Sequence, residues 1–200
     1  MAKLRLPVAP LAQRAAKVSL VVDAAHYDDL VMGVIAKAKT SIWIATANVK
    51  EMRIEAPIGS TARARGKYAS ILETFSSLAK RGVEIRLLHA TTPSRPFRAA
   101  LAAQDGLRTR AFAMRQCPRV HLKVIAVDGD ALYLGSANFT GAGLGAKGDG
   151  RRNFEMGILT DDEILLDATQ ARFERIWSGK ECGACKLRHV CPKPLDGGKR

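Results

Sequence analysis

The chain has 200 residues, enough for one ordinary domain with a sizeable core and a short appendage. Its 32 lysines and arginines exceed its 19 aspartates and glutamates, and the resulting net charge of +13 favours a polyanion such as DNA or RNA. No segment approaches the roughly 20 apolar residues of a membrane span. The early apolar run is interrupted by proline and charged residues, so a secretory signal is not expected. We expect a cytoplasmic protein without stable membrane association.

The first third of the chain alternates between strand-like and helix-like segments. Residues 18–22 are predicted to form a strand, 26–39 a helix with one apolar face, and 41–47 a buried strand. The segment 52–66 is polar, contains glycine and proline, and is expected to be a loop long enough to be functional or mobile.

The alternation continues through the middle of the chain. Apolar residues of the segment 68–79 recur at helical spacing, and Gly82 follows as a stop signal. Residues 83–89 are predicted to form a strand and 97–104 a short helix. This order of elements predicts an α/β domain with a sheet flanked by helices.

The segment 120–127 carries the most informative residues. Side chains of an extended segment alternate between two faces, so His121 and Lys123 share one face and the apolar residues next to them occupy the other. Beyond Lys123 both faces are apolar, which is typical of a strand entering a buried sheet. A cation in that setting must be paired, hydrogen-bonded or supplied with an anion, and a phosphate would suit it.

A hairpin and a loop rich in donors follow this strand. Asp128 opens a turn, residues 131–134 return as a short strand, and the segment 135–143 is dense in Gly, Ser, Thr and Asn. Donors that converge on one point suit an anion. A turn aspartate commonly hydrogen-bonds nearby backbone, so a structural role is expected for Asp128 more than a chemical one. Residues 154–159 are then predicted to form a strand and 161–177 a helix.

These residues resemble the signature of the phospholipase D superfamily of phosphodiesterases, carried here by His121-x-Lys123-x4-Asp128 and Gly135-Ser136-x-Asn138. The resemblance implies a mixed sheet flanked by helices over residues 1–178. It also implies a metal-independent reaction in which His121 attacks phosphorus to form a phosphohistidine, while Lys123 and Asn138, helped by Ser136, stabilise the developing charge.

Glu155 resembles the acidic residue that hydrogen-bonds the catalytic histidine in this superfamily. An acceptor there would fix the imidazole tautomer. An exposed strand carboxylate is the alternative, because the insert 141–152 leaves the register to Glu155 the weakest part of the resemblance.

The chain carries one His-x-Lys pair, which is half of a site, because its other three histidines lack a lysine two residues later. Superfamily members of this size and motif number are endonucleases that pair two chains. The resemblance therefore implies a homodimer that shares its active site across a two-fold axis and brings the two His121 side chains together.

Charge and resemblance together favour a nuclease acting on DNA or RNA. Basic residues cluster in 53–67, in 95–119 and at Lys147, Arg151 and Arg152. Two alternatives stay open: a phospholipid phosphodiesterase or phosphatidyl transferase with the same site, and a nucleic-acid-binding module without turnover.

The tail 179–200 is rich in cysteine. Cys182, Cys185 and Cys191 are spaced so that three soft ligands can reach one centre. The pattern resembles the C-terminal cluster that holds four irons in some DNA-processing nucleases of a different fold, with Cys117 as the distant fourth ligand. His189 is the competing fourth ligand and would favour zinc. Free thiols are the remaining alternative.

Overall fold

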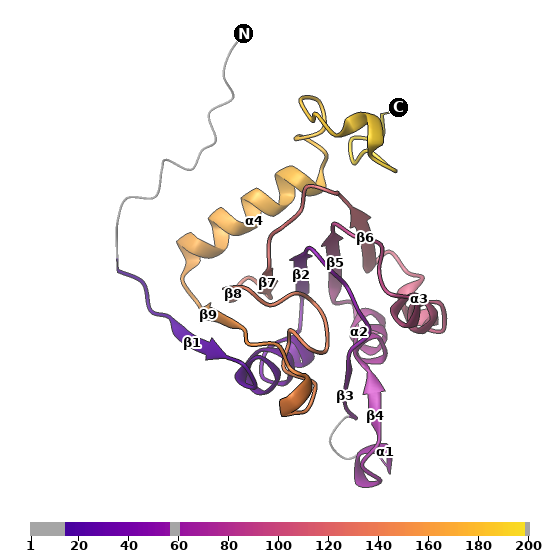
Figure 1. Ribbon diagram of the computed structural model, residues 1–200, viewed down its shortest axis with the longest axis vertical. Coiled ribbons are helices and arrows are strands. Elements are labelled where there is room, and N and C mark those ends of the chain that lie inside the picture. Colours follow the sequence, from indigo (N-terminus) through magenta and orange to yellow (C-terminus); the bar gives the residue numbers. More distant parts are fainter. Residues whose placement is uncertain (1–14, 57–60, 199–200) are drawn as a thin grey trace.

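The computed structural model describes residues 15–56 and 61–198, with the side chains of residues 62 and 63 excepted. The proline-interrupted segment at the start of the chain and part of the predicted loop 52–66 lie outside this range. A seven-stranded mixed sheet forms the centre, in the order β1-β9-β8-β7-β2-β5-β6 (Figure 1). The strands are β1 (Ser19–Val22), β2 (Ser41–Thr46), β5 (Glu84–His89), β6 (Phe112–Gln116), β7 (Val124–Val127), β8 (Ala131–Gly135) and β9 (Met156–Thr160).

The two halves of the sheet differ in direction. Strands β2, β5 and β6 run parallel to one another. On the other side of β2, every neighbouring pair is antiparallel: β2 with β7, β7 with β8, β8 with β9, and β9 with β1. A separate ribbon pairs β3 (Arg53–Glu55) with β4 (Tyr68–Ser70). The α/β class and the mixed sheet predicted from the sequence are confirmed.

Helices cover both faces of the sheet (Figure 1). The larger core lies on one face and includes buried residues of η1 and α2, while α4 packs on the other face through Phe173, Ile176 and Trp177. The helical segments are η1 (His26–Met32), η2 (Ile35–Lys37), α1 (Thr61–Ala64), α2 (Ile71–Lys80), α3 (Arg95–Ala102), η3 (Asp105–Leu107), η4 (Asp149–Arg151), α4 (Glu163–Trp177) and η5 (Arg188–Val190).

Three helices begin at side-chain caps, and at α3 the Ser94 hydroxyl accepts from the Phe97 N–H at 3.3 Å. Ser70 and Glu73 form a reciprocal capping box at α2, so the helix begins at Ile71 and residues 68–70 are free to pair as a strand. Asp162 accepts from the backbone N–H of Leu165 at the start of α4. The prediction that residue 68 already belonged to the helix was therefore wrong by three positions, because the cap fixes the start.

The predicted helix 26–39 is divided in two. Residues His26–Met32 form a π-helix and Ile35–Lys37 a 3₁₀ turn. Gly33 lies between them, and a Cβ at this position would come within 2.2 Å of the Asp29 carbonyl oxygen. The backbone is therefore wound in a way that only glycine allows here, which the apolar periodicity did not indicate.

Strand β6 was not predicted. It is an edge strand whose residues are at most half-buried, so it lacks the apolar run of a central strand. The sequence pattern was correspondingly weak.

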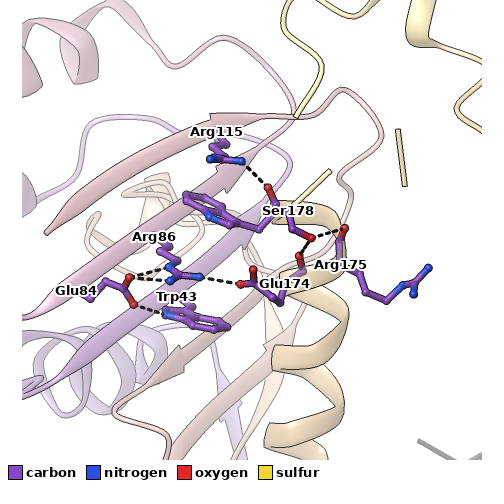
Figure 2. A network of polar contacts seen from close by, with 8 residues as sticks. Trp43, Glu84, Arg86, Arg115, Glu174, Arg175 and Ser178 are labelled. Carbon is purple, nitrogen blue, oxygen red and sulfur yellow. Dashed lines mark hydrogen bonds and ion pairs between the residues drawn. The ribbon is translucent and has the colours of Figure 1, made fainter. Parts of the chain in front are cut away.

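Arg86 of β5 fastens α4 to the sheet (Figure 2). Its guanidinium lies 4.7 Å from the ring centroid of Trp43 and 5.7 Å from that of Trp177. It also pairs with Glu84 at 2.8 Å and with Glu174 of α4 at 2.7 Å. Paired and stacked guanidinium contacts of this kind fix the helix in one register on the sheet.

Within the described ranges, the longest apolar helical stretch falls short of what a bilayer crossing requires.

Candidate active site

Four strand ends meet at one edge of the sheet. Because β7 runs antiparallel to β2 and β8, its first residue pairs with Ala45 near the end of β2 and with Leu134 near the end of β8. Gly135 at the end of β8 pairs in turn with Gly157 at the start of β9. The residues that immediately precede β7, follow β8 and precede β9 therefore lie in one row, and these residues are Lys123, Ser136 and Glu155.

His121 and Lys123 lie just before β7. The ladder begins at Val124, so the strand predicted from residue 120 is four residues shorter in the structure. The predicted alternation is nevertheless found, since Val120, Leu122 and Val124 all pack in the cluster beneath α4. His121 and Lys123 thus point away from α4, and His121 is exposed.

The two side chains are in direct contact. Lys123 Nζ lies 3.2 Å from Nδ1 and 3.3 Å from Nε2 of His121, and it donates to the His121 carbonyl oxygen at 3.0 Å. An exposed imidazole in contact with an ammonium can meet a phosphodiester with a nucleophile and a positive charge together.

Ser136 and Glu155 form the next pair along the row. The Ser136 hydroxyl donates a short hydrogen bond to the Glu155 carboxylate, which also accepts from Asn153 Nδ2 at 3.0 Å. Asp23 holds the backbone of Glu155 through two hydrogen bonds of 2.9 and 3.0 Å. Glu155 and His121, both within the described chain, share no hydrogen bond, so the contact expected between them is replaced by the bond to Ser136.

Asn138 lies on the β2 side of the same edge. Its Oδ1 accepts from the Asn48 backbone N–H at 3.1 Å and from the Thr46 hydroxyl at 3.2 Å. The Thr46 hydroxyl in turn accepts from the Phe139 N–H at 3.0 Å. The carbonyl oxygen of the Asn138 side chain is thus used in hydrogen bonds within the protein. Its amide nitrogen is left as the donor for a substrate oxygen.

A buried pair beneath the loop was not identified from the sequence. Burial lowers the pKa of His26, and the neutral ring donates from Nδ1 to the Asp23 carbonyl at 3.1 Å. Its Nε2 then accepts from the Tyr133 hydroxyl at 2.8 Å, and that hydroxyl accepts from the Ala137 N–H at 3.3 Å. Burial raises the pKa of Tyr133 to about 12. These three hydrogen bonds support the loop between Ser136 and Asn138. In the sequence, the only sign of this buried pair was a polar histidine on an otherwise apolar helix face.

Asp128 lies at the opposite end of β7, about 17 Å from Lys123 at the usual rise of a strand. Its carboxylate accepts from the backbone N–H groups of Lys39, Thr40 and Ser41 at 2.7–3.1 Å. This placement favours the structural interpretation over membership of the catalytic group, since Asp128 ties the turn after β7 to the start of β2.

A hollow of about 210 Å³ borders the site on the side of Asn138. Lys50, Lys147 and Asn153 line it, and both lysines are exposed. Burial raises the pKa of the Glu51 carboxyl, which lines the same hollow. Lys147 belongs to a basic cluster noted in the sequence, whereas Lys50 was missed because it stands alone there.

Several members of the predicted basic clusters serve the fold. Arg115 lies 5.0 Å from the Trp177 ring centroid and donates to the Trp177 carbonyl at 2.7 Å. Arg53 donates to the Tyr68 carbonyl. Arg152 forms a close ion pair with Asp149 and Arg108 one of 3.4 Å with Asp105. Sequence clustering therefore overstates the number of cations that can contact a polyanion.

The cysteines lie on the α4 side of the same sheet edge. Cys117, Cys182, Cys185 and Cys191 all line one cavity, whereas His189 is exposed and is not among its lining residues. Burial raises the pKa of the Cys117 thiol, and the other three cysteines raise it further. In the described part of the chain, no three His, Cys, Asp or Glu side chains are grouped closely enough to hold a metal ion.

Comparison with known proteins agrees with this geometry. A family model described as "Cardiolipin synthase, PLD-like domain" matches residues 31–177. The chain therefore belongs to the phospholipase D superfamily, and the prediction of this superfamily from the sequence is confirmed.

The chain is similar to a curated relative and to solved structures. The chain is 33% identical over 112 residues to the mitochondrial cardiolipin hydrolase of Xenopus tropicalis, covering 54% of this chain and 49% of that protein. It thus spans about half the length of this relative.

The phospholipase D family member Nuc from Salmonella typhimurium superposes with a TM-score of 0.56 at 22% identity, over 82% of this chain and 95% of Nuc. NucT from Helicobacter pylori gives 0.53 at 16% identity, over 80% and 95%. At sequence identities this low, the two structures show that the chain shares their fold, and no more than that.

Proposed function

We propose that the protein is a metal-independent phosphodiesterase that cleaves nucleic acid through a phosphohistidine. The observation that carries this proposal is the exposed His121–Lys123 pair, set in one row with Ser136 and Glu155 at the ends of four strands. The side chains alone would supply a nucleophile, a proton carrier and positive charge, so the chemistry does not depend on a metal.

In the first step a ring nitrogen of His121 forms a bond to phosphorus, and the bond from phosphorus to the leaving oxygen breaks. The leaving oxygen takes a proton from the partner subunit's His121. Water then attacks the phosphohistidine, gives its proton to that second histidine and releases His121. Lys123 and the Asn138 amide nitrogen would meet the charge on the non-bridging oxygens, where it increases in each transition state.

Two chains are needed because each supplies one histidine. An apolar surface next to the site supports such pairing: Leu20 of the edge strand β1 is 62% exposed, Met156 is 58% exposed, and Phe154 is 96% exposed. Leu20 pairs with Ile158 and Val22 with Met156, so Leu20, Val22 and Met156 emerge on one side of the sheet. This is the α4 side of the sheet, opposite to the side on which His121 and Lys123 point. Met156 directly follows Glu155, so a second copy seated here would reach the site across the start of β9.

Charge supports a nucleic acid as the substrate. The net charge of +13 attracts any polyanion, and Lys50 and Lys147 line the hollow beside Asn138, where phosphates flanking the scissile one could lie. The second candidate is a phospholipid, and the 33% identity to a cardiolipin hydrolase favours it.

The test uses the purified protein in EDTA with four labelled substrates: single-stranded DNA, double-stranded DNA, RNA and vesicles containing cardiolipin. We expect cleavage of at least one nucleic acid and loss of that cleavage in His121→Ala. His189→Ala is the matched control, because His189 is an exposed histidine away from the site, and it should cleave normally. If the protein cleaves only cardiolipin, the proposal of a nuclease is wrong and the phospholipid enzyme takes its place. Full activity of His121→Ala would refute both proposed functions.

The shared site has its own test. When equal amounts of wild-type and His121→Ala subunits exchange, the heterodimers should be inactive, and the activity per wild-type subunit should fall by about half. An active monomer in light scattering would contradict the shared site without contradicting the role of His121.

A further inference from the structure

All four cysteines of the chain line one cavity, although Cys117 is more than sixty residues from the others in sequence. Cys117 follows β6, and the other three belong to the tail that begins after α4. Figure 1 shows the tail, in yellow, beyond the end of α4 and above the tip of β6. The cavity has a volume of about 80 Å³.

Local bonds fold the tail back onto this edge. Successive backbone hydrogen bonds link Cys182 to Gly179, Cys185 to Cys182 and Cys191 to Arg188, so the segment turns repeatedly and brings its cysteines to one side. Arg115 donates to the Trp177 carbonyl at 2.7 Å and reaches the Leu195 carbonyl at 3.5 Å. The tail is thus held by contacts of its own before any ligand is considered.

We infer that Cys117, Cys182, Cys185 and Cys191 hold a four-iron, four-sulfur cluster in this cavity. A single zinc ion would draw four thiolates to about 2.3 Å from one point and leave no space between them. Here, by contrast, four cysteines from two separate segments of the chain line one open space. That space is about five times what a single water needs, which suits a polynuclear centre held by four thiolates.

The surroundings of the cavity also fit such a centre. A cluster bound by four thiolates is anionic, and Arg119, Arg172 and Arg188 line the same cavity. His189, the ligand that would point to zinc, is exposed and is not among the residues that line it. Glu181 also lines the cavity, but its carboxylate is paired with Arg172 and Arg175, so the four thiols are the donors left for a cluster.

The cluster would act on the active site through Cys117. The Cys117 N–H donates to the His89 carbonyl at 2.8 Å, and the Val120 N–H donates to the Cys117 carbonyl at 2.9 Å. This turn leads directly into His121. A cluster that joins Cys117 to the tail would thus fix the segment that carries the nucleophile, as a positioning element outside the reaction.

The test is the metal content of full-length protein purified without oxygen. We expect a brown protein with about four iron and four sulfide per chain. Cys117→Ser should lose most of the iron, whereas the matched control His189→Ala should keep it. His121→Ala should also keep its iron while losing cleavage, which separates this inference from the proposed function.

Three results would overturn the inference: one zinc per chain without iron, neither metal, or full iron in Cys117→Ser. Should Cys117→Ser fail to fold, the wild-type protein can be stripped of iron and then offered ferric iron, sulfide and dithiothreitol, which reduces part of the iron. Recovery of the brown colour at unchanged far-ultraviolet circular dichroism supports the cluster, and no uptake by the folded protein refutes it.

Discussion

Asp128 belongs to the sequence signature, yet its position assigns it to the fold. Replacing it should therefore reduce stability and leave the rate of the folded enzyme nearly unchanged. Two variants separate its contributions. Asp128→Asn keeps one acceptor oxygen and tolerates the backbone φ of +56° at this position, whereas Asp128→Ala loses every acceptor and also strains the backbone.

The magnitude follows from the contacts. Oδ1 accepts from the N–H of Thr40 at 2.7 Å and of Ser41 at 2.9 Å, and Oδ2 accepts from the N–H of Lys39 at 2.8 Å. Hydrogen bonds to a charged group each contribute about 1.5–3 kcal/mol where water is excluded, and less here because the turn is partly solvated. We expect a loss of about 1–2 kcal/mol for Asp128→Asn and about 3 kcal/mol for Asp128→Ala, including about 1 kcal/mol of backbone strain.

The effect should depend on pH with a definite sign. Burial alone would raise the pKa of Asp128, but the N–H groups of Ser41, Thr40 and Lys39 bind the carboxylate and lower its pKa below the ordinary value. A lowered pKa in the folded state adds stability that is fully present above the unfolded pKa of about 4. That stability is lost as the pH falls through the folded pKa, so the difference between wild type and Asp128→Asn should shrink in acid.

Urea unfolding followed by tryptophan fluorescence measures the stability, and hydrolysis of bis-p-nitrophenyl phosphate by the folded proteins measures the rate. Asp130→Asn is the control, because Asp130 is an exposed acid of the same turn and should change stability by less than about 0.5 kcal/mol. If folded Asp128→Asn hydrolyses the diester about 100-fold more slowly at unchanged stability, Asp128 takes part in the reaction and the structural reasoning fails.

Three other outcomes are expected. Tyr133→Phe should cost about 1–3 kcal/mol in urea unfolding, because the buried His26 ring and the Ala137 N–H lose their common partner, and an unchanged midpoint would contradict the brace beneath the loop. Leu20→Lys should convert the dimer to inactive monomers in light scattering; an active dimer would place the interface elsewhere. Lys147→Ala should reduce the slope of log K against log[salt] for nucleic-acid binding by about 1, and it should leave hydrolysis of a small diester unchanged. An unaltered slope would show that Lys147 is not part of the binding surface.

The sequence by itself determined the class of fold and the core of the candidate site. Both depend on short-range patterns. A period of two placed His121 and Lys123 opposite their apolar neighbours, and the structure has this arrangement even though the strand begins only at Val124. Caps at Ser70 and Asp162 determined where two helices start, because a cap acts on N–H groups within three residues of itself.

Only the tertiary structure decided which distant groups meet. His26 meets the hydroxyl of Tyr133, and Asp128 binds backbone that lies 87–89 residues before it. Arg115 donates a hydrogen bond to the carbonyl of Trp177, and Cys117 lines the same cavity as the cysteines of the tail. These contacts follow from the order and register of the strands, which bring separate strand ends to one edge. A local pattern of apolar and polar residues specifies which face of a strand a side chain occupies. It does not specify which other strand is the neighbour of that strand in the sheet.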